Sequence, residues 1–363
     1  MLASSAIREN MIRLVGRVMK RFLGKGLIKP PLYGGQVLGG AGSTLQSLKQ
    51  EGMVAMRKRW DAVVIGAGPA GVSCAVWLKR LGFEALLVEG SDRVGGLSAR
   101  NPFPDIWTVT SPGLTGEQVA QKLHESVMTA EIELWLKAHV IGIEREGRGI
   151  VEESGDGFVV RVQRDGQDAI NVSGKTVVLA SGVRPRGLPG YEAHLGDQYP
   201  GVFIGPGESV MNTPVQGLRV ALLGGGDNAF ENHGFLYERG AASVHVYART
   251  VRAQQQFVQR VKSEDLKLGS VVVDPVARTV NGQSYDLIWV FYGWQANADY
   301  LGDLSVQHDA RGFVVTQMAS AQTTEPGVYA IGEVAQRLHP CVPTAMADGV
   351  VAAKSIERLL GPG

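Results

Sequence analysis

The six residues Gly66-Ala-Gly-Pro-Ala-Gly71 have the types and spacing that a dinucleotide site requires. Gly66 permits a tight turn after a strand, Gly68 lets the backbone approach a pyrophosphate, and Gly71 lets the following helix pack closely. The N-terminus of that helix favours negative charge through its free N–H groups and its dipole. Glu89, after the next apolar run, can accept hydrogen bonds from ribose hydroxyls. The pattern predicts a dinucleotide-binding turn, with a glycine-rich turn of another α/β unit as the alternative.

A second run, Gly224-Gly-Gly-Asp-Asn-Ala229, repeats the fingerprint with alanine at its last position. The strand after it is followed by Arg249 and Arg252 and not by an acidic residue. An acidic residue at this place binds the ribose 2′-hydroxyl of NAD, whereas arginine suits the 2′-phosphate of NADP. The charges favour NADPH over NADH, unless both arginines are only solvated surface groups. The residues predicted to bind NADPH are Gly224, Gly226, Asp227, Asn228, Ala229, Arg249 and Arg252.

Cys341 and His339 are the candidates for direct chemistry, and each has a simpler interpretation. A thiol beside a helix N-terminus can have a lowered pKa and react, but Cys341 can equally be a small buried residue. His339 can polarise a bound ring or contact a substrate, or lie exposed on a loop. We therefore assign no catalytic residue. The other cysteine, Cys74, is far away in the sequence, which excludes a multi-cysteine metal site and fits a reducing, cytoplasmic location.

Each fingerprint has the strand, helix and second strand that must position it. The first has apolar runs at 60–65 and 85–88 around an amphipathic run at 72–81. The second has runs at 218–223 and 243–247 around a helix over 227–239. These patterns predict an α/β fold with two Rossmann-like units.

Outside these two units, the sequence predicts three further groups of elements. The first is a helix over 116–127 that begins near Thr115, followed by a strand over 131–136. The second is a β-meander over 140–172, with turns at 155–157 and 165–166, followed by a strand over 176–182. The third is a strand over 286–292, a strand that stops at Gly332-Glu333, and a helix over about 344–360.

The first residues differ from the rest, because no acidic residue occurs between Glu9 and Glu51. Basic residues and helical apolar spacing predict a basic amphipathic helix near 10–25, the part for which membrane contact is conceivable. It could be a transit-like or membrane-surface helix, a partner-docking arm, or a leader included by an early start, since Met53 and Met56 precede the first strand. We favour a leader or a disordered extension. The net charge of +1 gives no reason to expect nucleic acid as a partner.

As a set, these motifs resemble the pyridine-nucleotide-dependent FAD reductases, and among them the small thioredoxin reductase type. The resemblance runs from Trp60 to the C-terminus. Gly66–Gly71 resembles the FAD fingerprint, Gly224–Ala229 the NADPH fingerprint, and Gly327–Val334 the family's Gly-Val-x-Ala-x-Gly-Asp-Val segment. The resemblance implies two three-layer ββα domains and a homodimer. The residues that it implies for FAD are Gly66, Gly68, Pro69, Ala70, Gly71, Glu89, Gly96, Leu97, Val140, Ala180, Gly182, Gly332, Glu333 and Val342.

The same resemblance predicts how the chain divides into domains. Residues 1–56 would be the extension, residues 57–200 with 294–363 the FAD-binding domain, and residues 201–293 the NADPH-binding domain inserted into it.

Three departures from the family bear on function. Thioredoxin reductases carry a Cys-x-x-Cys just before the NADPH strand, but Phe203–Ser209 contains no cysteine. This predicts that electrons do not leave the flavin through a local disulfide. Glu333 stands where the family has Asp. The family's paired basic residues are reduced to Arg249 with Arg252 nearby, and residues 253–286 form a short stretch in which a hairpin could be lost.

We therefore expect an oxidoreductase that passes electrons from NADPH through FAD to an external acceptor. Dithiol-free relatives of this kind include ferredoxin and flavodoxin–NADP reductases, so a small redox protein is a reasonable acceptor, and small molecules remain open. One alternative is an FAD-dependent oxidase of a small substrate. Another is a flavin-bound regulatory module without turnover, which the short second domain and the altered arginine pair would favour.

Overall fold

The computed structural model describes residues 58–109, 111–146, 157–190 and 199–362, which belong to one compact unit. The predicted helix near 10–25, the extension 1–56 and most of the predicted turn at 155–157 lie outside the described residues. Within them, no helix is both long and apolar enough to cross a bilayer.

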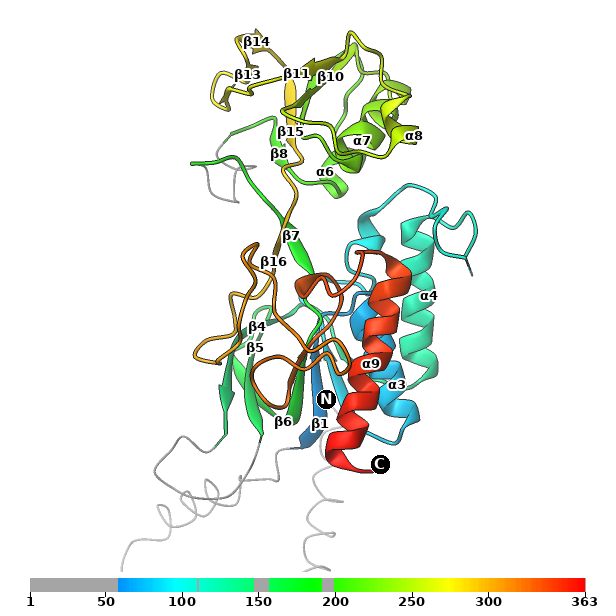
Figure 1. Cartoon of the computed structure of the whole chain (residues 1–363), viewed down its shortest axis with the longest axis vertical. Helices are drawn as coiled ribbons and strands as arrows, with labels where there is room; N and C mark the ends of the chain where they lie inside the picture. Colours follow the sequence, from blue (N-terminus) through cyan, green and yellow to red (C-terminus); the bar gives the residue numbers. More distant parts are fainter. Residues whose placement is uncertain (1–57, 110, 147–156, 191–198, 363) are drawn as a thin grey trace, which may run out of the picture. The chain divides into compact units, whose positions relative to one another are not determined.

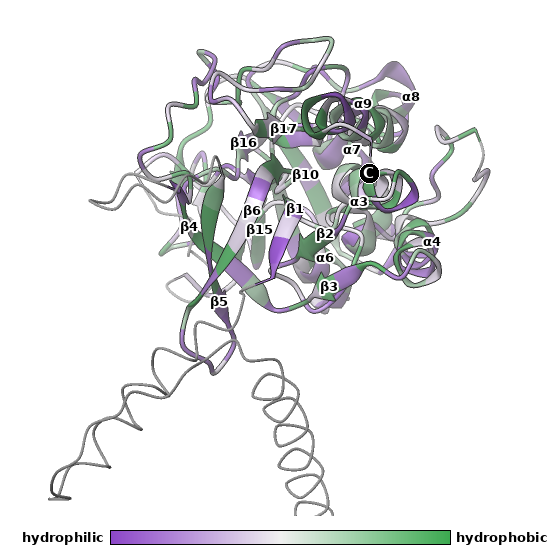
Figure 2. Ribbon diagram, turned by 90° about the horizontal axis from the view of Figure 1, so that it is seen from below, coloured by the Kyte–Doolittle hydropathy of each residue, from purple (hydrophilic) through white to green (hydrophobic). Residues whose placement is uncertain are grey.

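The first half of the molecule is built on a seven-stranded sheet of order β3-β2-β1-β6-β5-β4, with β17 also paired to β6. The central strands are parallel and are buried on both faces, which is why their sequences are continuous apolar runs. In β5, Phe158, Val160 and Val162 are buried and Arg161 is exposed. Figure 2 shows that β5 carries both hydrophobic and hydrophilic stretches. The strands are β1 (Arg59–Ile65), β2 (Ala85–Val88), β3 (Glu133–Trp135), β4 (Ala138–Arg145), β5 (Phe158–Arg164), β6 (Ile170–Leu179) and β17 (Val328–Ala330).

Strand β6 runs without a break from Ile170 to Leu179, whereas the sequence predicted the end of a meander and then a further strand over 176–182. Gly174 lies inside it, and a Cβ there would be 2.9 Å from Cγ2 of Val63 on β1. The glycine thus allows close approach of two strands and is not a break. One edge of β6 pairs with β1, and the other pairs with β5 and then with β17. A single strand therefore joins the meander, the central sheet and the C-terminal segment.

Three helices, α3 (Pro69–Arg80), α4 (Gly116–Thr129) and α9 (Val342–Leu360), lie side by side along one face of this sheet (Figure 1). The predicted start near Thr115 is confirmed, because the Thr115 hydroxyl accepts from the Gln118 N–H and the Gln118 side chain accepts from the Thr115 N–H. Gly349 of α9 lies so close to α3 that a Cβ there would be 2.6 Å from the Ala70 carbonyl oxygen. Two short 3₁₀ turns, η1 (Ser98–Arg100) and η2 (Gly332–Val334), complete this half.

The second half is built on a five-stranded parallel sheet of order β11-β10-β9-β15-β8. Helix α7 packs Ala229, Phe230 and Leu236 into the core of this sheet. The predicted helix over 227–239 and strands over 218–223 and 243–247 are confirmed to within one residue at each end. The elements are β8 (Val202–Ile204), α6 (Glu208–Asn212), β9 (Arg219–Leu223), α7 (Asp227–Glu238), β10 (Ser243–Ala248), α8 (Gln255–Val258), β11 (Leu266–Leu268) and β15 (Leu287–Val290).

The sequence suggested that the short stretch 253–286 could have lost a hairpin. This stretch still contains hairpin strands, which form an antiparallel three-stranded sheet. Two strands of an antiparallel ribbon connect the halves, with Pro185 opposite Trp294 and Val183 opposite Ala296. The predicted α/β fold with two Rossmann-like units is confirmed. These remaining strands are β12 (Val273–Asp274), β13 (Thr279–Val280), β14 (Gln283–Ser284), β7 (Val183–Pro185) and β16 (Trp294–Ala296).

Candidate functional site

The first glycine fingerprint forms a turn that only glycine fits. Gly66 has a φ of 105°, and a Cβ there would lie closer to the Ala180 carbonyl oxygen than van der Waals contact allows. The Gly66 N–H donates to the Val88 carbonyl oxygen at 2.7 Å, which closes the turn against β2. Pro69 is the first residue of α3, and Gly68 provides no side-chain cap. The first N–H groups of α3 therefore remain available to an anion.

Two glycine backbones face each other across this turn. Gly96 has a φ of 57°, and a Cβ on it would be 3.1 Å from the Cα of Gly68. This close approach leaves the peptide groups of both segments bare of side chains. A thin, elongated ligand such as a pyrophosphate can lie between such backbones.

Glu89 is held in one orientation by its own surroundings. One carboxylate oxygen accepts from the Ala67 N–H at 2.7 Å, and the other accepts from the N–H and the hydroxyl of Ser91, each at 2.8 Å. A carboxylate has about four acceptor positions. Three of these positions are taken, and because Glu89 also lines the cavity, the remaining one can receive a ribose hydroxyl.

These groups line one cavity of about 400 Å³. It brings together twelve of the fourteen residues that the sequence assigned to FAD. Gly71 does not line it, since Gly71 provides close packing of α3 on the Gly66 carbonyl. Val140 does not line it either, because it lies on β4 opposite Val162 and packs into the core on that side. The twelve are Gly66, Gly68, Pro69, Ala70, Glu89, Gly96, Leu97, Ala180, Gly182, Gly332, Glu333 and Val342.

Several cavity residues were missed by sequence reasoning. Ser98, Ser181 and Val183 stand next to predicted residues and Ser91 lies two residues after Glu89, so their position was a usable signal. Ser181 donates to the Asn297 carbonyl oxygen at 2.6 Å and accepts from the Tyr300 hydroxyl at 2.7 Å. The others reach the cavity through long-range folding, which no local pattern reveals. The missed residues are Ser91, Ser98, Arg100, Asn101, Ser181, Val183, Asn297 and Ala345.

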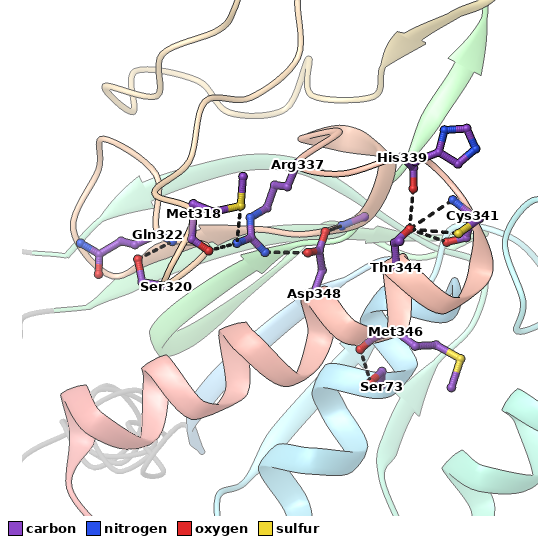
Figure 3. A network of polar contacts seen from close by, with 11 residues as sticks. Ser73, Met318, Ser320, Gln322, Arg337, His339, Cys341, Thr344, Met346 and Asp348 are labelled. Carbon is purple, nitrogen blue, oxygen red and sulfur yellow. Dashed lines mark hydrogen bonds and ion pairs between the residues drawn. The ribbon is translucent and has the colours of Figure 1, made fainter.

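The C-terminal segment adds the start of α9 to this cavity. Cys341 is the N-cap of α9, is half-buried and lines the cavity, and its sulfur lies 3.3 Å from the Thr344 hydroxyl. His339 does not line it: its ring is exposed and points away from the neighbouring polar groups (Figure 3). Burial raises the pKa of the Glu333 carboxyl. The geometry therefore supports Cys341, and not His339, as a residue near a bound ligand.

A second and larger cavity, of about 1310 Å³, lies at the second fingerprint. Gly224, with a φ of 152°, turns under the Phe291 carbonyl. The Gly225 carbonyl oxygen accepts from the N–H groups of Arg252 and Ala253, at 2.6 and 2.9 Å. These bonds hold the arginine loop over the fingerprint.

Arg249 and Arg252 line the second cavity and are exposed. Among the described residues, neither side chain has an ion pair or a hydrogen-bond partner. Two unpaired guanidinium groups at the end of β10 are suited to a phosphate. Arg184 and Arg186, from the connecting ribbon and the loop after it, also line this cavity and were not predicted.

Four of the residues predicted for NADPH do not line the cavity. Ala229 is buried in the core of the second half. The Asp227 carboxylate accepts from the backbone N–H and the side chain of Gln254, at 2.7 and 2.9 Å. Gly226, the N-cap of α7, faces open space, since a Cβ there would meet no atom within 4 Å. The fourth is Asn228, whose carbonyl oxygen accepts from Asn232.

The connecting ribbon contributes residues to both cavities. On β7, Val183 lines the first cavity and the next residue, Arg184, lines the second. On and just after β16, Gln295 lines the second cavity and Asn297 lines the first. Residues of this one ribbon therefore line both cavities.

The profile of one protein family, pyridine nucleotide-disulphide oxidoreductase, matches residues 60–349. The chain belongs to this family. Its members are flavoproteins that use FAD with a pyridine nucleotide, so the cofactors expected from the sequence, FAD and NADPH, are those of the family. No group of three or more potential metal ligands occurs among the described residues.

The names of proteins similar to this chain give different electron acceptors. A ferredoxin–NADP reductase of Limosilactobacillus fermentum is 26% identical over 305 residues, which are 77% of this chain and 86% of that protein. A thioredoxin reductase of Peptoclostridium acidaminophilum is 25% identical over 334 residues, which are 84% and 98%. The crystal structure of Lactococcus lactis thioredoxin reductase has a TM-score of 0.68 at 24% identity and covers 83% of this chain and 99% of that one. The resemblance to thioredoxin reductases in fold is thereby confirmed.

Proposed function

We propose that this protein is an oxidoreductase that takes electrons from NADPH and passes them through FAD to an external acceptor, with no active-site disulfide. The first cavity would hold FAD and the second NADPH. FAD, when bound, supplies the chemistry that accepts a hydride and hands its electrons on. The protein's own residues bind and orient the two cofactors and keep their reactive parts close.

The observation that carries the proposal is that the β7–β16 ribbon contributes residues to both cavities. Consecutive residues Val183 and Arg184 line different cavities. Electron transfer from one nucleotide to the other requires the two to be brought close, and this ribbon is the connection between their cavities. A flavin-bound module without turnover would have no need of a second cavity with two unpaired arginines.

The sequence of the segment Phe203–Ser209 supports an exit for electrons that uses no dithiol. This segment is the end of β8, a Gly205-Pro206-Gly207 turn and the start of α6. The chain has two cysteines, and both are free. We infer that the acceptor meets the flavin directly, as in a ferredoxin–NADP reductase, and that conventional thioredoxin reduction is not the activity.

A small redox protein is the acceptor that we favour, with a small molecule as the other possibility, and we expect a cytoplasmic homodimer. The ferredoxin–NADP reductase relative supports a redox protein as acceptor.

The test is to mix the purified full-length protein with NADPH without oxygen and to follow the flavin absorbance. We expect a yellow protein whose absorbance near the visible flavin bands bleaches within seconds. NADH should act more weakly at equal concentration. A protein that stays colourless with excess FAD, or a yellow one that neither nucleotide bleaches, would contradict the proposal.

A further inference from the structure

Behind the first cavity lies a buried ion pair whose two members come from different elements. Arg337 follows η2, and Asp348 lies in the second turn of α9. An Arg337 guanidinium nitrogen is 2.6 Å from an Asp348 carboxylate oxygen, and the side chains are only 4% and 5% exposed. Figure 3 shows the two side chains pointing toward each other. A buried pair of this kind is costly to desolvate, which makes a purely stabilising role a weak explanation.

Each member of the pair also holds a backbone segment. The other Asp348 oxygen accepts from the Gly332 N–H at 3.1 Å. The other end of the Arg337 guanidinium donates to the Met318 carbonyl oxygen (Figure 3). Asp348 thus connects α9 to the Gly332–Glu333 turn, and Arg337 connects the chain after that turn to a separate loop.

Neither side chain lines the first cavity, but both lie one layer behind it. Arg337 and Asp348 line a small side pocket together with Gly332, Glu333 and Cys341, and these last three also line the first cavity. The Gly332 backbone has a φ of 69°, and a Cβ on it would be 2.9 Å from the Ala70 side chain. The turn therefore lies close against α3, and the hydrogen bond from Gly332 to Asp348 ties it to α9.

We propose that Arg337 and Asp348 are a positioning pair, which fixes the Gly332–Glu333 turn against the start of α9 and so sets the affinity for the flavin and its midpoint potential. This rests on the proposed placement of FAD in the first cavity. The pair acts on the bound flavin in two ways. It holds the turn and the helix start in place, and its two opposite charges balance each other near the flavin.

The charges around the pair predict the direction in which each variant should shift the midpoint potential of the flavin. Asp348 faces Arg337 and the Gly332 N–H, and Glu333 is the other acidic group of the side pocket. Removing the Asp348 charge leaves the Arg337 cation uncompensated, and a nearby cation favours the reduced, more negative flavin. Removing the Arg337 charge has the opposite effect. A purely structural role would shift the potential of both variants in the same direction or not at all.

The test uses the full-length protein with Asp348→Asn, Arg337→Met and the apolar double variant Arg337→Met/Asp348→Leu. FAD affinity is measured by titration of the FAD-free protein, and the midpoint potential by equilibration with reference dyes. We expect each single variant to bind FAD about tenfold more weakly, as for the loss of a hydrogen bond to a charged group. The potential of Asp348→Asn should move to more positive values and that of Arg337→Met to more negative ones.

The double variant guards against loss of folding, because apolar replacement of a buried pair is often neutral for stability. It should fold and still bind FAD weakly. A matched control is Asp265→Asn, which removes the acidic charge from a second buried pair, with His233, in the second half, and should leave FAD affinity and potential unchanged. Wild-type affinity and potential in the double variant, or equal shifts in Asp265→Asn, would overturn the inference. A wild-type protein that binds no FAD would instead overturn the proposed function.

Discussion

The two glycine fingerprints of this chain resemble each other in sequence but form sites of different character. At the first, Glu89 has both carboxylate oxygens engaged and Gly66 is enclosed by the backbone of Ala180. At the second, Gly226 faces open space, and Arg249 and Arg252 are exposed. A pre-formed site loses little entropy on binding and suits a permanently held cofactor, whereas an open, charged site suits one that comes and goes. The difference supports FAD in the first cavity and an exchanging NADPH in the second.

The largest expected effect separates the enclosed glycine from the open one. Gly66→Ala places a methyl group against the Ala180 carbonyl at a φ of 105°. We expect a loss of about 3 kcal/mol of unfolding free energy and of bound FAD. Gly226→Ala, the matched change, should keep the wild-type stability and the wild-type content of FAD, because its Cβ would meet no atom within 4 Å. Denaturant unfolding measures the stability of both variants, and flavin absorbance measures their bound FAD. Equal destabilisation by both changes would remove the distinction between the two turns.

The unpaired arginines should determine nucleotide choice. Arg249→Ala should raise the KM for NADPH about tenfold to a hundredfold, since a charge-assisted hydrogen bond to phosphate is lost. The KM for NADH should hardly change. The control is Arg80→Ala, an exposed arginine at the end of α3, which should alter neither. If Arg249→Ala affects both nucleotides equally, the arginine does not bind a 2′-phosphate.

Removing the charge of Glu89 should reduce FAD binding less than distorting the glycine turn at Gly66. Glu89→Gln keeps the size of the side chain but deprives the Ala67 or Ser91 N–H of its acceptor. We expect FAD affinity to fall about tenfold while the KM for NADPH stays the same. Fluorescence titration of the FAD-free protein measures this, with the exposed Glu117→Gln of α4 as control. Unchanged affinity would show that Glu89 only braces the turn.

The smallest expected effect is on how the stability of the protein depends on pH, through a residue of the second half. Burial, and then the neighbouring Asp227, raise the pKa of Glu231 to about 7 from 4.5, and Arg260 opposes the shift. The folded protein holds this proton more tightly than the unfolded chain, so stability falls as the pH rises from 4.5 to about 7. Glu231→Gln should therefore raise the Tm above about pH 8 by a few degrees and leave it unchanged below pH 4.5, where both states are protonated. Glu238→Gln, exposed on the same helix, should change neither; a pH-independent Tm difference for Glu231→Gln would be the contrary result.

Local signals predicted most of the fold. Apolar runs gave the central strands, and Thr115 marked the start of α4 because an N-cap residue stands immediately before its helix. Strand β6 was divided at Gly174 because glycine weakens a strand pattern, while its purpose, close approach to Val63, depends on a distant segment.

The candidate site was predicted less completely, for a related reason. A glycine fingerprint predicts the course of the backbone but not the partners of its side chains, so it did not reveal that Gln254 occupies the Asp227 carboxylate. Arg184 and Arg186 reach the second cavity through the connecting ribbon, and Arg337 meets Asp348 through the packing of α9. Such pairings arise from tertiary folding and carry no sequence pattern.

The ribbon that connects the halves has a consequence for how such a protein can be rebuilt. Pro185 and Trp294 are register partners, so the chain leaves the first half and returns to it at neighbouring points. The residues between these two points could be replaced by the corresponding residues of another reductase, because the two ends at which the chain would be joined already lie side by side. The C-terminal segment offers no such freedom, because β17 pairs with β6 and α9 packs closely against α3, so its removal would expose the core of the first half.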